Sequence, residues 1–178
     1  MPPSTPLTPT AYVVLGLLAT NGPSTPYEME QFVDLSLGHF WSFPRSQLYS
    51  EPARLAERGL VEESREEGGR RRRRFSLTDA GREALQDWLG EQGPPSGTEI
   101  RDLGLLRLFF GAAARDEQDV VVNARAQAQA HRDKLALYAD LVQVVEEPHV
   151  AATLRLGTAY ERAAVAFWES LADDRSRP

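Results

Sequence analysis

The most constraining feature of this sequence is a short helix with two unlike faces. Apolar spacing predicts this helix over about residues 44–58, with Leu48, Pro52 and Leu55 on one stripe. The opposite stripe holds small and polar side chains. Gly59 is placed to end the helix, because glycine readily adopts the positive φ of a helix C-terminus. One face must therefore be buried in a core, whereas the other can approach a second molecule closely.

An arginine-rich hairpin is predicted directly after this helix. A short extended run at residues 60–63 is followed by Gly68-Gly69, by five consecutive arginines at 70–74 and by a second extended run at 75–77. Seven arginines against three acidic residues give residues 65–82 a charge of +4, although the whole chain carries −6. Salt screens charges beyond about 8–10 Å, so the local charge decides what the hairpin attracts. Helix, strand, basic hairpin and strand is the order of a winged helix-turn-helix.

Three further helices are expected around this unit. The first spans about Pro9–Ala19 and is apolar enough to be buried on most sides. The second begins at a capping box formed by Thr25 and Glu28 and runs to about residue 37. The third spans about 79–92. The inward positions expected on the second of these helices are Met29, Phe32, Val33 and Leu37. The apolar residues of the helix over 79–92 are Ala80, Ala84, Leu85, Trp88 and Leu89.

These features predict a DNA-binding surface. A small-faced helix can enter a major groove, and arginines on a hairpin can lie along phosphates, which supply most of the affinity. Strand alternation means that only two or three of the five arginines are expected to face DNA. Backbone amides at the start of the second helix can meet a phosphate, although Thr25 is already explained as a cap. The residues expected to contact DNA are Thr25, Tyr27, Arg45, Ser46, Gln47, Tyr49, Ser50, Arg54, Arg70, Arg71, Arg72, Arg73 and Arg74.

The second half of the chain has a helical pattern throughout. The Gly- and Pro-rich residues 93–98 predict a linker, so we expect a winged-helix DNA-binding domain over 1–92 and an α-helical dimerisation domain over 99–178. The predicted fold class is mainly α, with a small β-hairpin wing in the first domain. Helices are expected over about 99–113, where apolar residues on all sides predict burial on more than one side, over 116–147 and over 149–172.

A heptad seam runs along the long helix that follows Asp116. Apolar residues recur at alternating spacings of three and four from Val121 to Val145. The seam either packs inside the chain or pairs with a second copy. We expect a homodimer, because three helices do not easily cover so much apolar surface and because operators are often palindromic. The residues expected at its interface are Leu103, Leu106, Phe110, Val121, Ala124, Ala128, His131, Leu135, Tyr138, Val142, Tyr160 and Phe167.

Aromatic side chains in the second half have two interpretations, an effector pocket or dimer packing, and packing is favoured. The residues expected to line an effector pocket, if one exists, are Trp88, Phe109 and Trp168. Composition argues against other functions. The chain has no cysteine, its histidines are not clustered with carboxylates, and it shows no catalytic triad or glycine-rich phosphate loop. We expect no enzyme, no catalytic residue, no metal and no cofactor. No segment resembles a signal peptide or approaches the roughly 20 apolar residues of a membrane span, so a cytoplasmic location without membrane contact is expected.

Spaced elements across the chain form a recognisable pattern. In the first half they are LTPTAYVVLGLL at 7–18, Tyr27-Glu28, Phe40-Trp41, SQLY at 46–49, Arg54-Leu55, Gly59-Leu60-Val61, the basic wing and LTDAG at 77–81. In the second half they are LLRLFF at 105–110 and LGTAYE at 156–161 with Trp168. Together they resemble the PadR family of transcriptional regulators, in its longer subfamily with a virulence-activator-like α-helical C-terminal domain.

The resemblance implies a homodimer whose winged helices bind a pseudo-palindromic operator and whose C-terminal helices form the dimer interface. It also implies a regulator that is more often a repressor, and that in some members leaves DNA when a small aromatic or drug-like ligand binds. One position departs from the family, which more often has leucine where this chain has Pro52. Proline removes the amide bond back to Leu48 and is expected to kink the helix, while its ring fills the buried site.

The residues also leave a different class of function open. Winged helices serve in protein–protein contacts as well, so the alternative is an interaction or ligand-sensing module without specific DNA binding.

Overall fold

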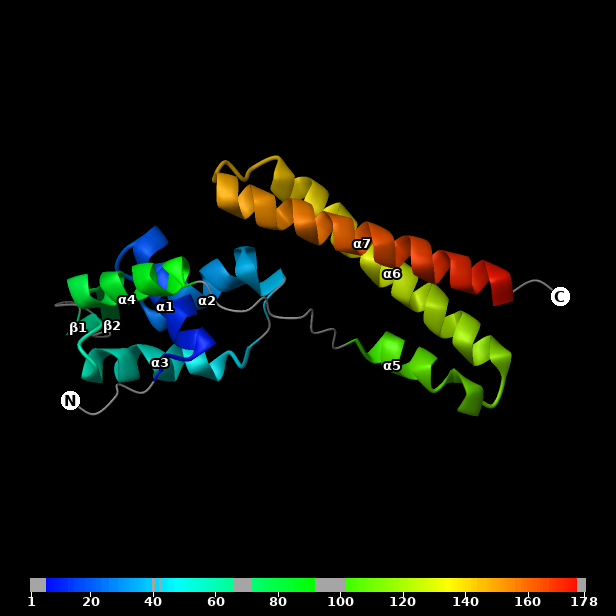
Figure 1. The fold of residues 1–178 in the computed structure, drawn as a ribbon, viewed down its shortest axis with the longest axis horizontal. Helices are drawn as coiled ribbons and strands as arrows, with labels where there is room; N and C mark the ends of the chain where they lie inside the picture. The colour runs from blue at the N-terminus through cyan, green and yellow to red at the C-terminus, as the bar shows by residue number, and fades with distance from the viewer. Residues whose placement is uncertain (1–5, 40, 42, 66–71, 92–101, 176–178) are drawn as a thin grey trace. The chain divides into compact units, whose positions relative to one another are not determined.

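The computed structural model describes residues 6–39, 41, 43–65, 72–91 and 102–175. The chain divides into two compact units, Met1–Pro95 and Ser96–Pro178 (Figure 1). Each unit has a hydrophobic cluster of its own. The predicted linker at 93–98 lies outside the described residues.

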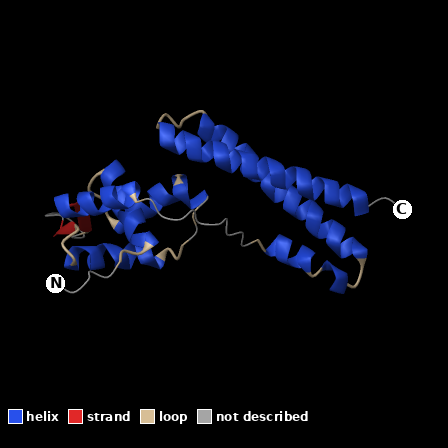
Figure 2. Cartoon of the chain, viewed as in Figure 1, coloured by secondary structure: helices blue, strands red, loops and turns tan. Residues whose placement is uncertain are grey.

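The first unit is a winged helix-turn-helix, which confirms the predicted fold. Figure 2 shows its two strands, in red, among helices. Its elements are α1 (Pro9–Asn21), α2 (Pro26–Leu35), the short 3-10 helix η1 (Leu37–His39), α3 (Ser46–Glu57), β1 (Val61–Arg65), β2 (Arg73–Leu77) and α4 (Asp79–Gly90).

Helix α1 forms the centre of this unit. Thr8 caps it by accepting a hydrogen bond from the amide of Ala11 at 3.2 Å, and Gly22, at φ 77°, ends it. Ala11, Val14 and Leu15 are fully buried. The other helices and the hairpin pack around α1, as its apolar sequence predicts.

The β-hairpin is tied to the rest of the unit through Phe75. Strands β1 and β2 pair antiparallel, with Val61 opposite Leu77 and Arg65 opposite Arg73. The backbone of Phe75 also exchanges two hydrogen bonds with Ser24, both at 2.9 Å. Its side chain is 1% exposed and enters the core. The segment before α2 therefore acts as a third, very short strand of the wing.

Helix α3 runs without interruption through Pro52. Leu48, Pro52 and Leu55 are buried, so the predicted apolar stripe and the predicted burial of the proline ring are confirmed. Gly59, at φ 72°, turns the chain out of the helix. The amide of Leu60 then donates to the carbonyl of Leu55 at 3.0 Å.

Helix α4 packs on α1. Of its apolar residues, Leu85 is buried, whereas Ala80 is exposed and Leu89 is 69% exposed. Gly81 is the residue that meets the core, because a β-carbon there would lie 2.0 Å from the carbonyl oxygen of Leu60. Trp88 covers α1 by stacking on Tyr12, with ring centroids 4.5 Å apart and planes 11° apart.

The second unit is an antiparallel pair of long helices with a short helix beside it. Its elements are α5 (Leu103–Phe109), the 3-10 helix η2 (Gly111–Ala113), α6 (Glu117–Val142) and α7 (Pro148–Arg175). Helices α6 and α7 lie along each other over much of their length (Figure 1). Their shared core contains Ala124, Ala128, Trp168 and Ala172. No helix in the described part of the chain combines the length and the apolar character that a bilayer crossing requires.

The seam prediction needs a correction at this point. Val121, Ala124, Ala128 and Tyr138 are buried inside the chain, and α7 is the main element packed on α6. They have no surface left for a second copy. The small alanines let a partner helix approach, as expected, but that partner is α7.

The prediction for α5 was wrong about its length. Its helix ends at Phe109 rather than at residue 113, and a separate 3-10 turn follows. In the single chain Leu103 is 70% and Phe109 78% exposed, so burial on a second side stays a prediction. Helix α5 packs mainly on α6, which covers one side only.

Candidate nucleic-acid interface

The polar face of α3 is exposed. Ser46, Tyr49, Ser50 and Arg54 all face outward, whereas the apolar stripe of the same helix is buried in the core. The Ser50 hydroxyl is turned back on its own helix, toward the Ser46 carbonyl at 3.4 Å. The exposed face of α3 therefore combines two small hydroxyl side chains with the longer side chains of Tyr49 and Arg54.

Two side chains at the start of α3 are held by α2. The Tyr49 hydroxyl donates to Oε2 of Glu30 at 2.6 Å. The hydrogen bond to Glu30 raises the pKa of the Tyr49 phenol. Arg45 forms an ion pair with Asp34. Both expected DNA contacts are exposed, but each already has a carboxylate partner within the protein.

Gln47 and Arg54 differ in their contacts within the protein and in their exposure to solvent. The Oε1 atom of Gln47 accepts a hydrogen bond from the Thr10 hydroxyl of α1 at 2.6 Å, and the side chain is only half-exposed. The expectation that the whole Gln47 side chain faces outward is thus corrected. The side chain of Arg54 is 70% exposed, and its nearest described carboxylate is Glu51 at 3.5 Å. Arg54 is the more accessible of the two.

The described arginines of the wing are not equivalent. Arg73 makes two hydrogen bonds to Glu63, at 2.7 and 2.6 Å, and lies over the Phe75 ring at 5.3 Å. This pairing raises the pKa of Arg73 and lowers the pKa of Glu63. Arg74 donates to the Pro23 carbonyl at 2.7 Å and to Glu28 at 3.1 Å. Both arginines are bound within the protein but stay partly exposed, so a phosphate contact by either one must compete with a carboxylate.

The remaining three wing arginines are Arg70, Arg71 and Arg72. Arg72 is exposed. Arg70 and Arg71 fall outside the described residues. The expectation that two or three of the five arginines face DNA stays a prediction, and it now rests on 70–72.

The start of α2 also requires a correction. Thr25 is 5% exposed. Its hydroxyl accepts from the amide of Glu28 at 3.3 Å, while its own amide donates to the Glu28 carboxylate at 2.7 Å. The capping box is confirmed, and it engages the amides of Thr25 and Glu28, which are backbone donors of the kind that was expected to meet a phosphate. Tyr27 is 58% exposed and stays accessible there.

Sequence reasoning missed the carboxylates that hold these cations. They are Glu28, Glu30 and Asp34 on α2, and Glu63 on β1. Glu30 and Asp34 are four residues apart and so share a helix face, which is the one local signal of a common role. Their partners lie on another helix, and sequence spacing does not reveal such a pairing.

The second unit separates the remaining predicted residues into exposed and buried groups. Leu103, Leu106, Phe110, Val142, Tyr160 and Phe167 are exposed. His131 and Leu135 are half-buried, and Nδ1 of His131 lies 2.5 Å from the buried carboxylate of Glu161. The exposed members of the predicted dimer interface therefore lie on α5 and on the outer faces of the long helices.

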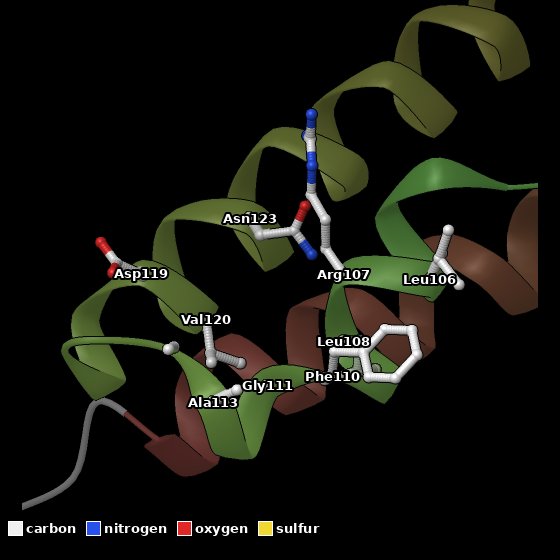
Figure 3. Close-up of a pocket in the computed structure, with 10 residues that line it drawn as sticks. Leu106, Arg107, Leu108, Phe110, Gly111, Ala113, Asp119, Val120 and Asn123 are labelled. Atoms are coloured by element: carbon white, nitrogen blue, oxygen red, sulfur yellow. The ribbon is translucent and has the colours of Figure 1, made fainter.

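An open pocket of about 450 Å³ lies between α5, η2 and the start of α6 (Figure 3). Its lining is mostly apolar, and Val120 projects from α6 toward the η2 turn. The three residues predicted to line an effector pocket do not belong to it. Trp88 lies in the first unit, where it stacks on Tyr12. Phe109 is exposed and touches the Phe110 ring. Trp168 is buried in the α6–α7 core. Residues that line the pocket are Leu106, Arg107, Leu108, Phe110, Gly111, Ala113, Ala114, Asp119, Val120 and Asn123.

The structure shows no group of three or more His, Cys, Asp or Glu side chains suited to a metal ion within the ranges that it describes. The ionisable residues of the first unit instead form pairs between a cation, or a phenol, and a carboxylate.

Comparisons with known proteins agree with this geometry. The chain is 32% identical over 101 residues to the negative transcriptional regulator PadR of Bacillus subtilis (strain 168). That alignment covers 56% of this chain and 54% of the relative, so it spans about half of that protein's length.

Solved structures show the same fold over nearly the whole chain. The B. subtilis PadR structure in complex with operator DNA matches with a TM-score of 0.78 at 24% identity, covering 93% of this chain and 98% of that one. The PadR complex with p-coumaric acid matches with a TM-score of 0.75 at 24% identity, over 94% and 98% of the two chains. The Vibrio cholerae virulence activator AphA matches with a TM-score of 0.68 at 21% identity, over 92% and 96%.

Two family models divide the chain between them. Residues 14–87 match the transcriptional regulator PadR-like family, and residues 100–173 match the C-terminal domain named virulence activator alpha. The two matches fall one in each of the compact units. The family consists of regulators rather than enzymes, and its two domains occur here in the expected order. The chain belongs to the PadR-like family of transcriptional regulators, with a C-terminal domain of the virulence-activator type.

Proposed function

We propose that this chain is a sequence-specific DNA-binding regulator that represses transcription as a homodimer on a pseudo-palindromic operator. The observation that carries the proposal is the exposed polar face of α3, residues 46–54, beside a wing that continues into three further arginines at 70–72. A major groove accepts a helix whose central side chains are small. Phosphates supply the affinity that brings such a helix to its site.

Repression and DNA binding are also supported by the relatives. The curated relative is named a negative transcriptional regulator, and a solved structure of the same fold holds operator DNA. A protein of this kind acts where the genome is, so we place it in the cytoplasm.

The exposed apolar side chains of the second unit support the homodimer. Helix α5 presents Leu103, Leu106, Phe109 and Phe110 to solvent, each more than half exposed. Surface patches of this kind mark interaction sites in soluble proteins. A second copy that covers α5 would bring two winged helices to one duplex, which a palindromic operator requires.

A small aromatic or drug-like ligand is the effector that fits the second unit. The pocket between α5 and α6 has a volume in the range of small-molecule sites. Arg107, Asp119 and Asn123 add polar groups to a mostly apolar lining. A structure of the PadR relative with p-coumaric acid supports this class of ligand. Ligand binding beside α5 would act on the same helix that we assign to the dimer interface.

Fluorescence anisotropy tests the DNA-binding proposal directly. The purified protein is titrated onto the duplex immediately upstream of its own gene and onto a scrambled duplex, over a salt series. We expect nanomolar binding to the upstream duplex, and much weaker and steeply salt-dependent binding to the scramble. Equal and weak binding to both would contradict the proposal and favour a winged-helix interaction module instead.

A further inference from the structure

Helix α2 carries two carboxylates that bind side chains at the start of the neighbouring helix α3. Glu30 and Asp34 lie one turn apart on the same face of α2. Glu30 accepts a hydrogen bond from the Tyr49 hydroxyl at 2.6 Å, and Asp34 pairs with Arg45. The order of the partners is reversed along α3, so the two pairs follow the line along which α2 and α3 pack.

Both pairs are open to solvent. The Arg45 side chain is 43% exposed and that of Asp34 57% exposed, and Tyr49 is 48% exposed. Exposed pairs of this kind are held weakly and exchange readily for other partners. A phosphate or a base edge that approaches α3 therefore competes directly with Glu30 and Asp34 for the same donors.

The two carboxylates also change the charge that α3 presents. Asp34 cancels the charge of Arg45, and Glu30 adds a negative charge beside Tyr49. Both lie well within the distance of about 8–10 Å over which charges act at ordinary salt. Non-specific binding consists almost wholly of contacts between cations and phosphates, so these carboxylates oppose it more than they oppose a complex that also contains base contacts.

We propose that Glu30 and Asp34 are specificity-determining residues, which withhold Tyr49 and Arg45 from non-specific DNA and release them when α3 meets its operator. This inference rests on the proposed function and extends it to a second helix. On the operator, base contacts by α3 offset the lost pairs. On other DNA, no such contacts form, and the pairs stay closed.

The test compares Asp34→Asn and Glu30→Gln with Asp87→Asn in the full-length protein. Asp87 is exposed on α4, which packs mainly on α1. Its substitution removes one negative charge, as Asp34→Asn does, but at a site away from α3. Affinity is measured by anisotropy for the upstream duplex and for a scrambled duplex, over a salt series. Thermal unfolding of each variant shows that its fold is retained.

We expect Asp34→Asn to bind the scrambled duplex several-fold more tightly, with a salt slope steeper by about one. Affinity for the upstream duplex should rise less, so the ratio between the two duplexes falls. Asp87→Asn should change both affinities equally and slightly. The same ratio in Asp34→Asn and Asp87→Asn would overturn the inference, because charge alone would then explain the effect.

Double variants separate release of a donor from a merely structural effect. In an Arg45→Ala background, Asp34→Asn has no cation to release, so its effect on the scrambled duplex should shrink to what the lost negative charge alone gives. In a Tyr49→Phe background, the effect of Glu30→Gln should shrink in the same way. Effects of undiminished size in both backgrounds overturn the inference.

The upstream duplex also shows which claim has failed. A wild-type protein that prefers its operator, with variants that keep the same ratio, contradicts this inference alone. A wild-type protein without any preference contradicts the proposed function, and this inference with it.

Discussion

Arg74 on the wing and Glu28 on α2 share one ion pair, with Nη2 and Oε1 3.1 Å apart. The other oxygen of the same carboxylate accepts from the amide of Thr25 at 2.7 Å. That backbone hydrogen bond is the main reason why the pKa of Glu28 is lowered, and the charge of Arg74 adds to it. A single carboxylate therefore closes the cap of α2 and fixes the wing to it.

This arrangement predicts opposite roles for neighbouring arginines. Arg74→Ala should lower the free energy of unfolding by about 0.5–1 kcal/mol, because the pair is partly exposed. Arg72→Ala should leave stability unchanged but weaken binding to all duplexes and reduce the salt slope by about one. Thermal unfolding and salt-dependent anisotropy check the two effects. An Arg72→Ala variant with an unaltered salt slope would show that the exposed end of the wing does not meet phosphate.

Two of the helical glycines, Gly81 and Gly16, predict opposite responses to alanine. At Gly81 a β-carbon would lie 2.0 Å from the Leu60 carbonyl oxygen, and backbone cannot move aside cheaply. Gly81→Ala should therefore destabilise the first unit by about 1–3 kcal/mol. Gly16 in α1 has open space at the corresponding position, so Gly16→Ala should stabilise by up to about 1 kcal/mol. Urea unfolding of both variants measures the difference, and a stabilising Gly81→Ala would contradict the described packing of α4.

The buried carboxylate of Glu161 predicts a pH dependence in the second unit. Burial raises its pKa, but hydrogen bonds from Lys134 and His131 lower it more, so the pKa lies below the ordinary 4.5. His131 also faces Asp102, with its Nε2 3.9 Å from Oδ2 of that residue. Because the pKa of Glu161 is lowered on folding, its contribution is complete above the unfolded pKa of about 4.3 and is lost as the pH falls through the folded value.

Glu161→Gln removes this contribution. We expect the variant to be less stable than the wild type by about 1–3 kcal/mol at pH 7, and the difference to shrink as the pH falls below about 4. Denaturant unfolding at pH 7, 5 and 3.5 measures the difference. Lys134→Met serves as a control, because it removes a partner of the carboxylate but keeps Glu161 itself. A difference that stays constant with pH would mean that Glu161 is not ionised in the folded protein.

The exposed apolar face of α5 predicts which substitutions prevent dimer formation. Leu106→Asp with Phe110→Asp should give a monomer that keeps its helical content, since both side chains are more than half exposed and their loss leaves the core intact. Leu89→Asp on α4, also exposed, should leave the dimer unchanged. Sedimentation at several concentrations distinguishes the species. A monomeric wild type, or a dimer that survives the double substitution, would contradict the assignment of α5.

Features set by neighbouring residues in the chain were predictable from the sequence. The capping box of Thr25 and Glu28, the buried stripe of α3 and the glycine that ends it each depend on contacts within one helix or one turn. The wing followed from the same logic, because strand, glycines and arginines occur in order. Even the burial of Pro52 followed from its position on the stripe.

Features set by partners far away in sequence were not predictable. Spacing identifies an apolar face but not what covers it, so the seam of α6 was assigned to a second copy although α7 buries it. The apolar residues at 99–113 were expected to be buried on more than one side, but within the single chain α5 packs on one side only. Arg73 and Arg74 look alike in sequence, but only the register of the hairpin brings one to Glu63 and the other to Glu28.

The α6–α7 hairpin has a consequence for the order in which the protein assembles. Its cross-helix pairs join residues that are close in sequence, with 30 residues between His131 and Glu161 and 37 between Arg132 and Glu169. Loops of this length close at modest entropic cost, and helical pairs with near contacts form fast. Because α7 rather than a second copy fills the seam, the hairpin can form on an isolated chain at a rate that does not depend on protein concentration. The association of two chains through α5 that we propose would then be a later, second-order step, which joins surfaces that are already folded.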